Sequence, residues 1–144
     1  MRNHFVTAAR VLLGLVFVVF GLNGFLGFLP APELPGPAGA FVGALAATGY
    51  MIPLIKGTEV VAGALLLANR FTPLALVVLA PVIVNIVLFH GVLAPEGMAM
   101  PLFVLALELY LAWSYRDAFR GVLSAKAEPA AARASQKAAR TAHA

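Results

Sequence analysis

Five strongly polar side chains interrupt the long apolar stretches of this sequence: Asn23, Lys56, Glu59, Asn85 and Glu108. If these stretches cross a bilayer, each charged side chain near the centre of a span costs about 2.5–3.5 kcal/mol. Such groups are tolerated in a membrane when they are paired, protonated, or in contact with water or a ligand. Counted at about 1.5 Å per residue, all five fall between the outer third and the midplane of the membrane. We therefore predict one polar site inside the membrane.

The ionisable groups of this site cannot all neutralise one another. One lysine balances one carboxylate, so the second carboxyl is expected to be protonated or hydrogen-bonded to an asparagine. Lys56 precedes Glu59 by three residues, which is the weaker order for a pair within a helix, so Glu108 is an alternative partner. A structural clasp between helices would use the same residue types, but ionisable groups inside membranes most often serve a ligand or a proton. We favour a ligand site in which Glu59 and Glu108 handle a proton or hydrogen-bond the ligand, while Lys56 and Asn85 position it.

Asn23 and His90 complete the set of candidate ligand-binding residues. Asn23 has the right depth, but it points away from the face of its helix that carries Arg10 and Gly21. His90 lies near the outer end of its span, where a histidine at the membrane surface is the simpler interpretation. Both are therefore weaker candidates than the other four residues.

Cysteine and histidine usage excludes several kinds of chemistry. The chain has no cysteine, so thiolate nucleophiles, disulfide exchange, iron–sulfur clusters and cysteine-based zinc sites are excluded. Its histidines, His4, His90 and His143, lie far apart, so we predict no metal site and no haem held by two histidines of one protomer. No catalytic motif is recognisable, and no covalently bound cofactor is implied. Whether the chain is an enzyme stays open.

The elements that must position these residues are membrane-spanning helices. Of the 144 residues, 62% are hydrophobic and 11% are charged, with a mean hydropathy of +0.94, whereas soluble domains carry about 25% charged residues. We predict an all-α fold: an integral membrane, antiparallel four-helix bundle, with a short outer or interfacial helix over residues 39–49. The proline-rich segment 30–37 is expected to be a loop. The four spans are expected at about 8–29, 50–69, 73–93 and 98–116.

The two ends of the chain have separate interpretations. The first apolar run is longer than the h-region of a signal peptide, about 7–15 residues, so we expect it to be retained as a span. The spans make up one membrane domain, residues 1–120. Residues 121–144 are basic, rich in alanine and without apolar periodicity, which predicts a disordered tail.

The distribution of basic residues predicts the orientation. Five arginines fall on one side of a four-span topology, and the opposite side carries no lysine or arginine. The positive-inside rule then places both termini in the cytoplasm. The net charge of +4 reflects this distribution, so we exclude a nucleic-acid partner. The five arginines are Arg2, Arg10, Arg70, Arg116 and Arg120.

The sequence resembles the DoxX family over roughly residues 6–120. The resemblance is carried by the order and spacing of Lys56, Glu59, Gly63, Asn85 and Glu108, within stretches such as Ile52 to Gly63, Asn69-Arg70-Phe71 and Leu88-Phe89-His90. It implies a small four-helix membrane protein of bacteria or archaea. The family takes its name from a small membrane subunit of a thiosulfate:quinone oxidoreductase. No catalytic residue carries over, and relatives linked to thiol redox work use membrane-facing cysteines that this chain lacks.

Together, these observations predict a membrane subunit of a redox system that binds a quinone-like molecule at the polar site. The expected partners are the lipid bilayer, a soluble or membrane redox protein, and further copies of the chain. Two alternatives remain open: a proton-coupled carrier of a small hydrophobic metabolite or lipid, and a structural anchor for a soluble enzyme.

Overall fold

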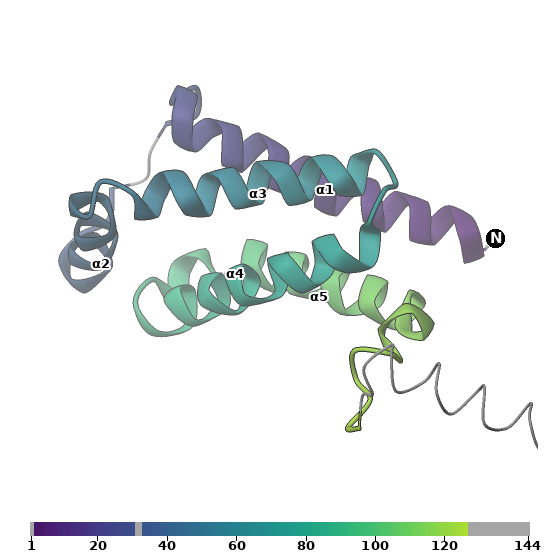
Figure 1. The fold of residues 1–144 in the computed structure, drawn as a ribbon. Coiled ribbons are helices and arrows are strands. Elements are labelled where there is room, and N and C mark those ends of the chain that lie inside the picture. Colours follow the sequence, from purple (N-terminus) through teal and green to yellow (C-terminus); the bar gives the residue numbers. More distant parts are fainter. Residues whose placement is uncertain (1, 31–32, 127–144) are drawn as a thin grey trace, which may run out of the picture.

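The computed structural model describes residues 2–30 and 33–126 of the chain, and its regular elements are all helical in this part. The longer helices lie roughly along one another, and a shorter helix lies across one end (Figure 1). Two short 3-10 turns, Pro95–Gly97 and Arg116–Phe119, precede and follow the last helix. The five α-helices are α1 (Arg2–Leu26), α2 (Gly36–Ala47), α3 (Met51–Leu67), α4 (Thr72–Val92) and α5 (Ala99–Ser114).

The helix ends follow local signals in the sequence. α1 ends at Leu26 rather than Leu29, because Gly27 adopts a left-handed φ of 61° that suits a glycine after a helix. α2 begins directly after Pro35, earlier than the expected residue 39. α4 begins with Pro73 in its first turn, where the missing N–H is not needed.

α1 and α3 are the most closely packed pair of helices, and glycines allow their close approach. A Cβ atom added at Gly63 would lie 2.9 Å from the carbonyl oxygen of Gly14 and 3.0 Å from the backbone nitrogen of Val18. Small residues that let backbones approach are typical of helix packing in membranes. Gly14 and Gly63 therefore let the backbones of α1 and α3 approach closely.

The remaining contacts close a ring of four helices around an apolar core. α3 also packs on α4, α4 packs on α5, and α5 returns to α1. The six largest fully buried side chains come from all four helices: Leu13, Leu66, Leu76, Leu79, Ile83 and Leu111. Many large apolar side chains point outward instead, including Phe25, Leu88 and Trp113, as expected of a surface that faces lipid.

By length and composition, α1 from His4 and α4 are each long and apolar enough to cross a membrane. α2 and α3 meet at an angle of 91°, and this bent pair passes the same criterion if it is counted as one span. α5 is apolar but only 16 residues long. The protein thus has two to three candidate spans on this criterion. The predicted tail lies outside the described residues from residue 127 onward.

Candidate functional site

An ion pair between Lys56 and Glu59 lies at the centre of the candidate site. The Lys56 Nζ lies 2.8 Å from Glu59 Oε2 and 3.1 Å from Oε1, so the ammonium group donates to both carboxylate oxygens. The Glu59 side chain is 4% exposed and that of Lys56 is 27% exposed. Lys56 therefore pairs with Glu59 on its own helix and not with Glu108, the alternative partner.

Glycines of α1 make room for this ion pair. A Cβ atom added at Gly21 would lie 3.1 Å from the Cβ of Glu59 and 3.1 Å from the carbonyl oxygen of Lys56. A Cβ at Gly24 would overlap the aliphatic stem of the Lys56 side chain. The Lys56 stem therefore packs against the backbone of α1, which restricts where its ammonium group can go.

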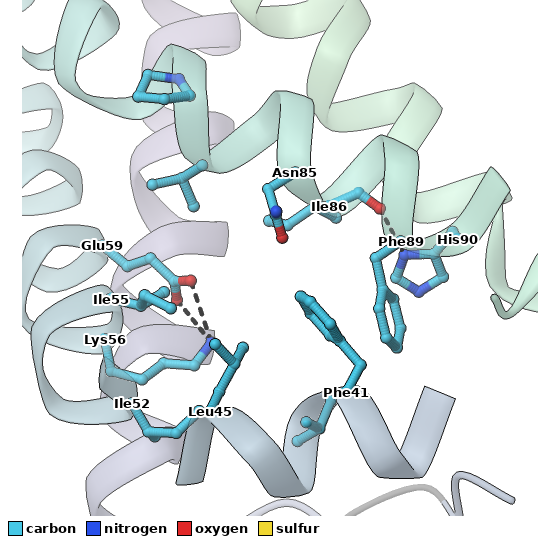
Figure 2. Close-up of a pocket in the computed structure, with 13 residues that line it drawn as sticks. Phe41, Leu45, Ile52, Ile55, Lys56, Glu59, Asn85, Ile86, Phe89 and His90 are labelled. Atoms are coloured by element: carbon cyan, nitrogen blue, oxygen red, sulfur yellow. Dashed lines mark hydrogen bonds and ion pairs between the residues drawn. The ribbon is translucent and has the colours of Figure 1, made fainter. Parts of the chain in front are cut away.

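The ion pair opens onto a pocket of about 470 Å³ between α2, α3 and α4. Most of its lining is apolar, from α2 (Phe41, Leu45), α3 (Ile52, Ile55) and α4. Figure 2 shows Lys56 and Glu59 on one side of this space and Asn85, Phe89 and His90 on the other, with Phe41 below. The pocket thus combines apolar walls with a few polar groups, the usual composition of a small-molecule site.

Asn85 faces the ion pair across this pocket (Figure 2). It shares a face of α4 with Pro81 and Phe89, which also line the pocket, because residues four apart lie on one face of a helix. Its side-chain amide makes no hydrogen bond to any residue that the structure describes, and the residue is exposed. A donor and an acceptor are therefore available to a molecule in the pocket.

His90 lies at the rim of the pocket with one ring nitrogen already engaged. Its Nδ1 lies 2.9 Å from the carbonyl oxygen of Ile86, and a carbonyl only accepts, so Nδ1 carries the proton in the neutral ring. The His90 ring stands edge-on to the Phe89 ring, with 5.1 Å between the ring centroids. The centroids of the Phe89 and Phe41 rings lie 5.7 Å apart. Nε2 makes no hydrogen bond to any of residues 2–30 and 33–126 and can act as an acceptor.

A second pocket, of about 460 Å³, lies on the other side of the ion pair. It is bounded by α1 (Phe17, Phe20) and α5 (Met100, Pro101, Val104). Four residues line both pockets: Lys56, Glu59, Ile86 and His90. The ion pair thus lines two largely apolar pockets that share α3 and α4, one completed by α2 and the other by α1 and α5.

Two of the predicted site residues lie apart from these pockets. The Asn23 side chain accepts a hydrogen bond of 2.7 Å from the backbone N–H of Leu29, so it closes the end of α1. Glu108 is 6% exposed, and its Oε2 is the one buried side-chain polar atom without a hydrogen-bond partner among the described residues. Neither residue lines either pocket. The structure therefore brings together Lys56, Glu59, Asn85 and His90.

Two residues acquire roles that sequence reasoning missed. Arg10 was interpreted only as a topology signal, yet it is 7% exposed and donates to the carbonyl oxygens of Leu66 and Leu67 at the end of α3. Phe41 of α2 forms a wall of the first pocket. No local pattern marks Phe41, because its position depends on how α2 folds back. Among residues 2–30 and 33–126, no three His, Asp or Glu side chains are grouped as a metal site would need.

Comparison with known proteins assigns the family. The sequence model of the DoxX family matches residues 5–91, which include Lys56, Glu59, Asn85 and His90 but not Glu108. No curated protein and no solved structure matches the chain. The match covers more than half of the sequence and confirms the resemblance over residues 5–91. This chain is a membrane protein of the DoxX family.

Proposed function

We propose that this protein binds a quinone-like molecule at the Lys56–Glu59 ion pair and serves as a membrane subunit of a redox system. The observation that carries the proposal is the position of the ion pair between two largely apolar pockets that share it. A quinone has a polar ring and an apolar tail. It therefore suits a charged pair at membrane depth beside spaces that accept hydrocarbon.

The polar groups of the site match what a quinone ring offers. Its carbonyl oxygens are acceptors, for which the Lys56 ammonium and the Asn85 amide are donors. On reduction the ring gains hydroxyl protons, for which the Glu59 carboxylate and His90 Nε2 are acceptors. Phe41 and Phe89 supply aromatic faces beside the ring. Because the chain has no cysteine, the electrons would come from a partner protein.

Lipid-soluble quinone should accompany the purified protein and should appear in an organic extract analysed by mass spectrometry. Added decylubiquinone should raise the thermal unfolding temperature of the quinone-free protein in detergent. The Lys56→Met/Glu59→Gln variant, which removes both charges together, should bind decylubiquinone at least roughly tenfold more weakly, because it loses charge-assisted hydrogen bonds.

A matched control is the Lys126→Met/Glu96→Gln variant, which makes the same two replacements at exposed positions. It should bind decylubiquinone as the unmodified protein does. Equal weakening in both double variants, or no stabilisation of the unmodified protein by decylubiquinone, would refute this assignment of the site.

The proposal includes a membrane topology. In it, α1, α3, α4 and α5 each cross the inner membrane of a bacterium as an antiparallel bundle, with α2 on the outer side and both termini in the cytoplasm. Support comes from the four-helix packing ring and from the absence of Lys and Arg in residues 27–50 and 93–98. α3 and α5 span about 24–26 Å, and small mismatches of this kind are accommodated by bilayer thinning.

Reporter fusions test this topology directly. A cytoplasmic reporter fused at Arg70 or after Arg120 should be active, and the same reporter near Glu33 or Glu96 should be inactive. A periplasmic reporter should give the reverse pattern. A periplasmic signal after Arg120 would mean an odd number of crossings, and the four-crossing topology would be wrong.

A further inference from the structure

A third pocket, of about 560 Å³, lies at the end of the molecule where α1 begins and α5 ends. It shares no lining residue with the two pockets around Lys56 and Glu59, so it is independent of the proposed quinone site. Its lining is rich in polar side chains and contains no Asp or Glu. The polar residues that matter most are Thr7, Arg10, Asn69, Tyr110, Ser114 and Arg116.

Arg10 is the deepest charge in this pocket. Arg10 is 7% exposed. Within the described residues its Nη1 donates to the carbonyl oxygens of Leu66 and Leu67, and its other nitrogens make no hydrogen bond. These carbonyls end α3, where the helix dipole favours a cation. A guanidinium has five N–H donors, so those on Nε and Nη2 remain available.

No carboxylate of the described residues balances Arg10. The ion pairs found there join Lys56 with Glu59 and Arg120 with Asp117. A buried cation without a counter-ion is costly, and backbone carbonyls offset only part of that cost. The charge of Arg10 therefore favours an anion entering from outside.

Arg116 brings a second guanidinium to the rim of the pocket. Its Cζ lies 5.1 Å from the centroid of the Trp113 ring, and its Nη1 donates to the Trp113 carbonyl oxygen at 3.1 Å. This contact holds the exposed side chain at the pocket instead of leaving it free in solvent. Two guanidiniums with neighbouring hydroxyl and amide donors are the combination that binds phosphate oxygens in proteins.

We infer that this pocket binds an anionic phosphate ester and that the headgroup of an anionic phospholipid supplies it. Trp113 and Tyr115 line the pocket, and such aromatic side chains gather at the headgroup level of a bilayer. Basic pockets between membrane helices are also where anionic headgroups bind. A zwitterionic choline headgroup fits less well, because the lining offers its cation no carboxylate and Arg116 already covers Trp113.

The test uses the full-length protein, delipidated in neutral detergent, with thermal unfolding as the readout. Phosphatidylglycerol should raise the unfolding temperature, whereas phosphatidylcholine and inorganic phosphate should not. Arg116→Gln should need a roughly tenfold higher phosphatidylglycerol concentration for the same rise in unfolding temperature, because it loses a charge-assisted contact. Arg120→Gln is the matched control, because Arg120 is exposed, pairs with Asp117 and does not line the pocket. It should respond as the unmodified protein does.

Arg10→Gln should weaken phosphatidylglycerol binding more than Arg116→Gln does. Arg10 also donates to carbonyl oxygens at the end of α3, so a lost lipid response of Arg10→Gln supports the inference only if this variant still unfolds cooperatively. Arg116→Gln keeps the inference testable if it does not. Stabilisation by inorganic phosphate equal to that by phosphatidylglycerol would support the anion site and overturn its assignment to a lipid. An equal response to phosphatidylglycerol and phosphatidylcholine, or identical behaviour of Arg116→Gln and Arg120→Gln, would overturn the site itself.

Discussion

The Lys56→Met substitution is expected to lower the free energy of unfolding by about 3–5 kcal/mol, the cost of breaking a buried ion pair from one side. The Glu59 side chain is 4% exposed, and its carboxylate accepts hydrogen bonds from the Lys56 ammonium group. Without the ammonium group, that carboxylate remains as an uncompensated charge among apolar side chains. Thermal or denaturant unfolding of the purified protein in detergent measures the loss.

A second substitution separates this cause from a simple packing defect. In Lys56→Met/Glu59→Gln both charges are gone, and replacing a buried pair by neutral groups of similar volume is often nearly neutral. Most of the lost stability should therefore return. The control Lys126→Met, at an exposed position, should change stability by less than about 0.5 kcal/mol. If Lys56→Met unfolds no more readily than this control, Glu59 does not depend on Lys56 for its burial.

The Gly63→Leu substitution is expected to destabilise the protein by about 1–3 kcal/mol through overpacking. Even a Cβ at this position would meet backbone atoms of Gly14 and Val18 at 2.9–3.0 Å. Backbone cannot rotate away as a side chain can, so α1 and α3 would have to separate. Because Gly21 and Gly24 of α1 pack against Lys56 and Glu59, the ion pair should be displaced as well, and decylubiquinone binding should weaken.

Gly57→Leu is the matched control on the same helix. A Cβ at Gly57 meets nothing within 4 Å, and leucine exceeds glycine in helix propensity by nearly 1 kcal/mol. This variant should be as stable as the unmodified protein or slightly more stable. The comparison is made by unfolding both variants in the same detergent. Equal stability of Gly63→Leu and Gly57→Leu would show that α1 and α3 do not depend on close backbone approach.

The helices could be located from the sequence because the signals for them are local. Apolar runs, the proline-rich segment before α2 and Pro73 in the first turn of α4 are each visible in short stretches of chain. The observed bounds differ from the expected ones by a few residues, as at Leu26, where the end depends on Gly27 and on a hydrogen bond from Leu29 to Asn23. Asn23 was assigned to the site from its depth in the membrane, but its side chain instead accepts this hydrogen bond at the end of α1.

The sequence by itself determined that polar groups lie inside apolar helices, and that Lys56 and Glu59 share a helix face, because i,i+3 spacing is a property of one helix. Only the tertiary structure decided which groups meet across helices. Asn85 and His90 line the same pocket as the ion pair, Glu108 Oε2 has no hydrogen-bond partner among the described residues, and Arg10 donates to carbonyl oxygens at the end of α3. The physical reason is that helices apolar on every side carry little information about rotation. Their rotation is set by contacts such as those between Gly14 and Gly63.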